Sequence, residues 1–142
     1  MSQNVKTLNL DYDSSCYGKE DTIQNCFILF TLQNNSNQQV APDNYIFPVK
    51  LKKAKILKPT VTISTVRQND ASGRHFIIEI KSTTIALFVW LDTNGISGHF
   101  SDNGFMQVTP IKHVQFYADQ STTPEDLYNY LTVTHLSDDE YM

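Results

Sequence analysis

Cysteine is scarce in this sequence, which has two among its 142 residues, Cys16 and Cys26, ten positions apart around a polar segment. Two cysteines provide neither a zinc-ligand set nor a Cys-x-x-Cys redox motif. In an oxidising compartment their pairing would close a short loop and stabilise the fold by about 3 kcal/mol, whereas in the cytosol they would stay ordinary thiols. The length alone allows about two thirds of the unfolded surface to be buried, so the fold needs no metal or disulfide framework.

Long apolar runs are also absent. No run reaches the roughly 18 residues of a membrane-spanning helix, and the longest candidate, residues 85–91, has the length of a strand. The first residues, Met-Ser-Gln-Asn, carry neither the basic stretch nor the apolar core of a secretory signal. We therefore expect a soluble globular chain with no membrane span, either cytosolic or cut from a longer protein whose signal lies upstream.

Positive charge is in deficit, because the formal net charge is −4 at pH 7. This balance argues against a general nucleic-acid binder. The positive residues that exist are gathered, with five lysines inside nine residues: Lys50, Lys52, Lys53, Lys55 and Lys58. They either protect an edge strand or a solvated loop from pairing with other chains, or bind a phosphate or polyanion.

Motifs for catalysis and metal binding are lacking as well. Acid–base hydrolysis needs two carboxyl groups at a defined separation, one of them with a raised pKa, but the acids here fall in turns and termini. Only Glu79 lies inside a predicted strand, on the face opposite Phe76 and Ile78. The histidines are too far apart in sequence for a local metal motif: His75, His99, His113 and His135. We expect no catalytic residue, no metal and no cofactor.

What the sequence does contain is a series of strand-like segments every 10 to 15 residues, separated by turn-forming clusters. Residues 5–10 alternate apolar and polar side chains, and residues 26–32 are continuously apolar, as in a central strand. Residues 33–39 are too polar to bury. Residues 45–49 form a brief aromatic strand that Pro48 demotes towards an edge. No linker interrupts the chain, which predicts a single domain over residues 1–142.

The clearest hairpin joins residues 60–66 to residues 75–80 through the turn Asn-Asp-Ala-Ser-Gly at 69–73. Alternation places Val61, Ile63 and Thr65 on one face of its first strand. The second strand places residues 76, 78 and 80 on one face.

The remaining segments complete an all-β fold. A strand at residues 86–91 is followed, after a segment rich in Gly, Asn and Asp, by a strand at residues 114–117. Thr123, Pro124 and two acids then predict a short helix, because threonine caps and proline suits the first helical position. Strand character resumes at residues 131–136, and an acidic, solvated tail follows. About eight strands and one short helix near the C-terminus predict a two-sheet β-sandwich.

The most distinctive stretch is Phe-Val-Trp-Leu-Asp at residues 88–92, followed by Gly-His-Phe-Ser-Asp-Asn-Gly-Phe at residues 98–105. Its first part predicts a strand that delivers Trp90 to the core. Its second part predicts a tight turn, in which Asp and Asn cap and Gly adopts positive φ, clamped between Phe100 and Phe105.

This pattern resembles the C-terminal immunoglobulin-like domain of animal β-mannosidases, in glycoside hydrolase family two. The resemblance continues at residues 114–117 (Val-Gln-Phe-Tyr) and 131–138 (Leu-Thr-Val-Thr-His-Leu-Ser-Asp), and is looser upstream. It implies an immunoglobulin-like sandwich within an enzyme that removes terminal non-reducing β-D-mannose from oligosaccharides, using two glutamates. Those glutamates would belong to a barrel of about 250 residues, which this chain is too short to contain. The resemblance thus implies a non-catalytic domain whose partners are the remaining domains of its parent.

The resemblance further implies a lysosomal glycoprotein. Asn34 begins an Asn-Asn-Ser sequon in a polar loop, which makes it the predicted glycosylation site. Cys16 and Cys26 become the predicted disulfide partners. Lys52 stands where some relatives have a further cysteine, so their cross-links do not transfer whole.

Two other functions compete with the structural one. In a carbohydrate-binding module, Phe100 and Phe105 would stack on a sugar while Asp102 and Asn103 bonded its hydroxyls, giving weak carbohydrate binding; turn capping and core packing explain the same residues. An independent adhesion-type immunoglobulin module fits less well, because both cysteines precede Trp90 and the Cys-Trp-Cys order is missing.

Overall fold

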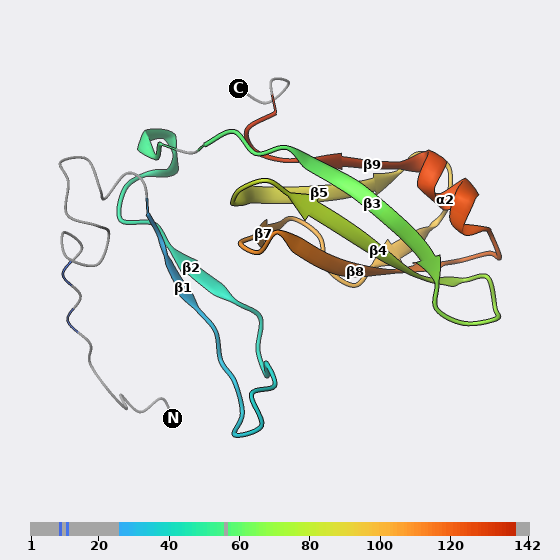
Figure 1. Ribbon diagram of the computed structural model, residues 1–142, viewed down its shortest axis with the longest axis horizontal. Helices are drawn as coiled ribbons and strands as arrows, with labels where there is room; N and C mark the ends of the chain where they lie inside the picture. The colour runs from blue at the N-terminus through green and yellow to red at the C-terminus, as the bar shows by residue number, and fades with distance from the viewer. Residues whose placement is uncertain (1–8, 10, 12–25, 56, 139–142) are drawn as a thin grey trace. The chain divides into compact units, whose positions relative to one another are not determined.

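The structure is a computed structural model that describes residues 9, 11, 26–55 and 57–138. The chain divides into two compact units, Met1–Ile56 and Leu57–Met142, and each is described by itself (Figure 1). The strand predicted at residues 5–10 and Cys16 lie outside the described residues, apart from Asn9. The single domain over residues 1–142 stays a prediction.

In the first unit the described strands form one hairpin. Strand β1 (Ile28–Phe30) pairs antiparallel with β2 (Asn44–Ile46) in a two-stranded sheet, and a 3-10 turn, η2, follows at Leu51–Lys53. The loop at residues 33–39 is exposed, as predicted. The prediction of a central strand at residues 26–32 is wrong for the described residues, because this loop folds the chain straight back and gives β1 a single neighbour.

The second unit contains two antiparallel sheets that stack on each other (Figure 1). The larger sheet has the order β3-β4-β8-β6 and the smaller the order β7-β5-β9. The seven strands are β3 (Val61–Gln68), β4 (His75–Ser82), β5 (Ala86–Thr93), β6 (Gly98–Phe100), β7 (Phe105–Gln107), β8 (Ile111–Ala118) and β9 (Leu131–Thr134). The predicted all-β, two-sheet sandwich is confirmed, with nine strands in the described residues against about eight predicted.

The core lies between these two sheets. Its side chains are all apolar and at most 9% exposed: Phe76, Ile78 and Ile80 from β4, Ala86, Val89 and Leu91 from β5, Phe105 from β7, Val114, Phe116 and Ala118 from β8, Leu131 from β9, and Leu127 from the helix. The predicted inward face of residues 76, 78 and 80 is confirmed. Burial at this scale, worth roughly 25 cal/mol per Å² of apolar surface, is the main stabilising contribution.

The β3–β4 hairpin is confirmed, but its first strand contains a bulge. The register shifts between Ile63 and Thr65, so that Ser64 is the extra residue. Beyond the bulge Val66 packs against the core and Thr65 is exposed. The prediction that Thr65 shares the face of Val61 and Ile63 is therefore wrong, because a bulge inverts the alternation that follows it.

A second irregularity reverses the orientation predicted for Trp90. Phe88 has φ +50, and the register of β5 shifts between Ala86 and Val89. Val89 and Leu91 consequently fill the core, whereas Trp90 is 53% exposed on the outer face. The prediction of a core tryptophan is wrong, since alternation alone does not tell which of two apolar sets points inward.

The C-terminal elements follow the sequence signals closely. Helix α2 (Pro124–Tyr130) begins after Thr123, whose hydroxyl accepts a hydrogen bond from the Asp126 amide at 3.1 Å. No helix in the described ranges is long and apolar enough to cross a membrane. The solvated tail predicted at residues 137–140 is wrong for Ser137, which is 5% exposed. Asp138 is partly exposed and bonded to His135, and the rest lies outside the described residues.

Candidate functional site

The candidate site predicted from the sequence is the turn between β6 and β7, which holds Phe100, Asp102, Asn103 and Phe105. Asn103 is bonded to the central strand β5: its Oδ1 accepts from the Leu91 amide and its Nδ2 donates to the Leu91 carbonyl, both at 2.8 Å. These bonds fall two residues beyond the Val89–Phe105 pair in the antiparallel register. The amide side chain therefore replaces a backbone peptide group and extends the ladder by one step.

The other residues of this turn are also engaged by the fold. Phe105 is 8% exposed in the core, and the ring of Phe100 packs against that of Phe116 with 4.9 Å between centroids. Asp102 pairs with Lys112 at 2.9 Å, and the Lys112 ammonium lies 4.4 Å from the centroid of the Phe105 ring. The structure brings the four predicted residues together, in contacts that favour turn capping over sugar binding.

The predicted strand carboxylate, Glu79, lies on the outer face of the larger sheet. Its Oε1 accepts from the Ser64 hydroxyl at 2.6 Å, and His113 Nε2 lies 3.2 Å from its Oε2. The Ser64 hydrogen bond, followed by that of His113, lowers the pKa of Glu79. Ser64 reaches this position because it is the bulge residue of β3. A general acid requires the opposite shift.

Two of the histidines form a stack on the same outer face. The strand register places His75 and His99 opposite Tyr117 from either side. Their rings stack on the phenol ring with centroid distances of 4.5 and 5.1 Å. His75 Nε2 also lies 2.7 Å from Gln115 Oε1. Tyr117 is thereby covered on both ring faces, and this leaves neither face for a sugar.

His135, the last histidine, is part of a closed turn. Its side chain is 6% exposed and lies 3.2 Å from Asp138, and its Nδ1 accepts from the Ser137 amide. Within the described ranges no group of three or more His, Cys, Asp or Glu side chains could hold a metal ion. The expectations of no metal and no cofactor stay predictions.

The predicted covalent modifications fall in the first unit. Asn34 is exposed at the hairpin tip, where its Oδ1 accepts from the amides of Ser36 and Gln38 and its Nδ2 donates to the Gln38 side chain at 3.0 Å. Cys26 is disulfide-bonded. Because Cys16 lies outside the described residues, the Cys16–Cys26 pairing stays a prediction.

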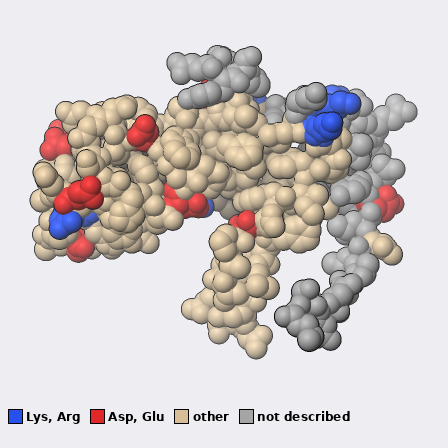
Figure 2. All heavy atoms as spheres, turned by 180° about the vertical axis from the view of Figure 1, so that it is seen from behind, with Lys and Arg blue, Asp and Glu red and all other residues tan. Residues whose placement is uncertain are grey.

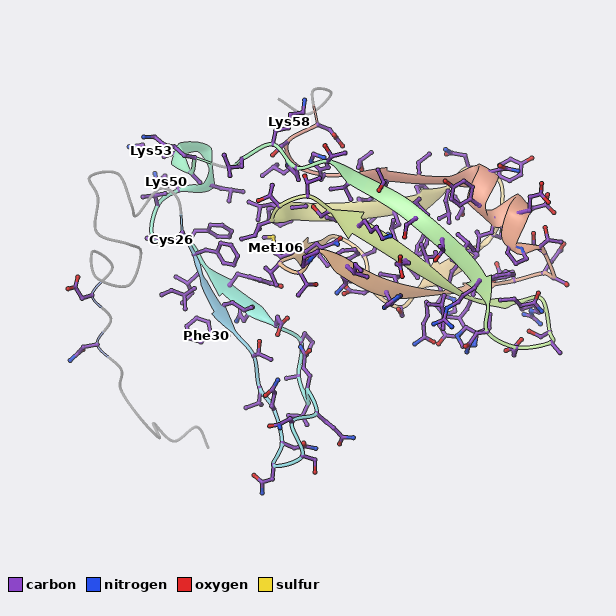
Figure 3. The ribbon with its side chains drawn as sticks, in the orientation of Figure 1. Cys26, Phe30, Lys50, Lys53, Lys58 and Met106 are labelled. Atoms are coloured by element: carbon purple, nitrogen blue, oxygen red, sulfur yellow. The ribbon has the colours of Figure 1, made fainter. Side chains whose placement is uncertain are left out.

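The lysine cluster lies between strands β2 and β3. Lys50 precedes the turn η2 and Lys53 is its last residue; both are exposed and are labelled in Figure 3. Figure 2 shows Lys and Arg side chains in blue at more than one place on the face that it presents. The interpretation of a solvated loop fits this placement.

Sequence reasoning missed two surface side chains. Phe88 and Trp90 are 44% and 53% exposed on β5. The sequence does contain a signal for this orientation. Val89 and Leu91 occupy the alternate positions of the same strand, and these aliphatic side chains can fill the core as well as the two aromatic rings can.

The two stacked sheets and the helix at their end define the second unit as an immunoglobulin-like β-sandwich domain. A family model described as an Ig-fold domain, Ig_mannosidase, matches residues 51–139, more than half of the chain. The chain belongs to this family, and the resemblance predicted from its sequence is confirmed.

The curated relatives are longer proteins. They include the beta-mannosidase of Rattus norvegicus, 37% identical over 123 residues, and those of Capra hircus and Bos taurus, each 36% identical over 117 residues. The alignments cover 84% of this chain for the rat protein and 82% for the other two. The chain spans 13% of the length of each; in these relatives most of the polypeptide lies outside the matched segment.

The Asn103 clamp predicts a large loss of stability on truncation. In Asn103→Ala both polar groups of the Leu91 backbone lose their partner, and we expect the free energy of unfolding to fall by about 2–4 kcal/mol. Urea unfolding of the 142-residue chain measures this loss. Asp102→Ala is the matched control, since an exposed ion pair contributes at most about 1 kcal/mol; equal losses in the two variants would contradict the clamp.

The lowered pKa of Glu79 predicts a pH-dependent contribution to stability. A carboxylate with a depressed folded-state pKa stabilises the fold above the unfolded pKa, roughly 4.3 for glutamate, and loses this effect as the pH falls through the folded-state value. Glu79→Gln should therefore be less stable than the parent chain above that pH, with the difference shrinking under stronger acid. Urea midpoints on both sides of the transition test this, and parallel curves would count against it. Ser64→Ala should raise the carboxyl pKa in an NMR titration.

Proposed function

We propose that this chain is a non-catalytic structural domain, at the C-terminal side of a β-mannosidase that hydrolyses terminal non-reducing β-D-mannose residues in oligosaccharides and glycoproteins. The observation that carries the proposal is how the fold uses the turn that marks the family. Asn103 extends the β5 ladder, Phe105 fills the core and Asp102 pairs with Lys112. These side chains serve the sandwich, so the domain's partners are the remaining domains of the parent.

The acidic side chains support the same proposal. A glycosidase needs a carboxylic acid with a raised pKa beside a second carboxylate. The pKa of Glu79 is lowered by Ser64 and His113, and that of Asp70 is lowered by its hydrogen bonds with Ser72. Both groups stay ionised where a general acid must hold a proton. The two glutamates of the reaction belong, on this proposal, to a catalytic domain elsewhere in the parent.

A carbohydrate-binding module is the rival function, and it makes a different demand on the same turn. Sugar stacking requires accessible aromatic faces, but Phe105 is in the core and Phe100 packs on Phe116. The buried position of Phe105 and the packing of Phe100 on Phe116 favour the structural function.

Hydrolysis and binding assays on the purified 142-residue chain test the proposal directly. We expect no release of 4-nitrophenol from its β-D-mannopyranoside, and no heat on calorimetric titration with mannose or mannobiose. In the complete parent, deleting this domain should lower the unfolding temperature. Turnover by the isolated chain would overturn the proposal, and saturable heat with mannobiose would replace it with sugar binding.

A lysosomal, glycosylated parent is part of the proposal, with Cys16 and Cys26 paired and Asn34 carrying the glycan. Among the described residues the acceptor nitrogen of Asn34 donates to the exposed Gln38 side chain, and breaking one exposed hydrogen bond costs little. Chain secreted from animal cells should lose mass on treatment with peptide N-glycosidase F, and Asn34→Gln should abolish this loss. Asn35→Gln keeps the sequon and is the control. Secreted wild-type chain without a mass change would remove Asn34 from the proposal.

A further inference from the structure

The smaller sheet of the sandwich carries two aromatic rings on its solvent side. Phe88 and Trp90 are 44% and 53% exposed, although β5 is the central strand, with β7 and β9 on its two edges. Trp90 lies opposite Thr134 of β9, and Asp92 follows two residues along the same face. We call these four residues the β5 outer face. Contiguous exposed apolar side chains on a folded protein commonly mark an interaction surface.

The outer face of the other sheet has a different composition. There Glu79 is bonded to His113, and the Tyr117 hydroxyl donates to Gln115. The Tyr117 ring is stacked between those of His75 and His99. The rings on that face are engaged with one another, whereas Phe88 and Trp90 on the smaller sheet are 44% and 53% exposed.

The β5 outer face is held rigidly. A Cβ on Gly104, which has φ +66, would lie 3.5 Å from Cε3 and 3.6 Å from Cζ3 of Trp90, so the indole rests over this glycine. The Asn103 clamp fixes the next residue of the strand, Leu91. Phe88 keeps a positive φ that is rare for an aromatic residue. A preorganised surface loses little conformational entropy on binding.

We propose that the β5 outer face is the surface by which this domain packs on the rest of its own polypeptide. This inference rests on the proposed function. The matched segment makes up 13% of the beta-mannosidases similar to this chain, so in such a protein a much larger body is tethered to the domain. Tethering gives a high effective concentration, and a modest area then suffices. The contacting surface is apolar opposite the two rings and carries a cationic or N–H donor opposite Asp92.

The fluorescence of the isolated chain tests whether a second copy or a sugar occupies this surface instead, because Trp90 is the only tryptophan of the sequence. We expect emission typical of an exposed indole, accessible to acrylamide, that changes neither with protein concentration nor with added mannobiose. A blue shift on concentration would assign the surface to a second copy, and a shift with mannobiose would assign it to a sugar. Either result overturns the docking proposal and leaves the hydrolysis assay unaffected.

Substitutions compared in two contexts test the docking itself. In the complete parent, Trp90→Ser should make proteolytic release of the domain about tenfold faster, which corresponds to losing about 1.4 kcal/mol of docking free energy. In the isolated chain the same variant should unfold at nearly the same temperature, because the side chain is half exposed. Ile111→Ser, at a side chain 46% exposed on the other sheet, is the matched control and should change neither.

Phe88→Asn should affect the stability of the isolated chain and the docking of the domain in the complete parent in opposite directions. Asparagine tolerates positive φ, so the isolated chain should keep or raise its unfolding midpoint, while the complete parent should release the domain faster. Unchanged release in both variants, or equal destabilisation in both contexts, would overturn the proposal. Whether the complete parent has β-mannosidase activity tests the proposed function and not the docking surface, and it is measured on the unsubstituted protein.

Discussion

The turn by which the chain passes from one sheet of the sandwich to the other depends on the amide side chain of Asn103. This amide stands in for a peptide group beside Leu91 and so extends the β5–β7 ladder past the point where the chain turns. Only a side chain with both a donor and an acceptor can satisfy the two backbone groups of a buried strand residue. A carboxylate at this position has no hydrogen to donate to the Leu91 carbonyl.

Two backbone irregularities then decide which residues face the solvent. The bulge at Ser64 directs its hydroxyl to Glu79 while Val66 returns to the core. The positive φ of Phe88 turns that ring outward and leaves the aliphatic side chains of β5 inside. One sheet therefore presents a hydrogen-bonded polar surface, and the other presents an aromatic one.

The sequence predicts those parts of the fold that depend on local chemistry, such as the β3–β4 turn and the cap of α2 at Thr123. It fails for Thr65, because a bulge resets the phase of the alternation and has no side-chain signature of its own. It fails for Trp90, because alternation does not tell which of the two apolar sets of β5 points inward. The turn containing Asn103 was identified from sequence, yet its role was not. That role depends on Leu91, twelve residues earlier, and on a strand register that only the folded sheet defines.

Strand β9 has a consequence for the order of assembly. It supplies the second edge of β5, pairing Trp90 with Thr134, and the amide of Leu136 bonds to the carbonyl of Leu87. During synthesis about 40 further residues must therefore be added after β5 before β9 is available. Until then one edge of β5 is unpaired, and its two aromatic rings are exposed beside that edge. An open edge of this kind invites pairing with other nascent chains.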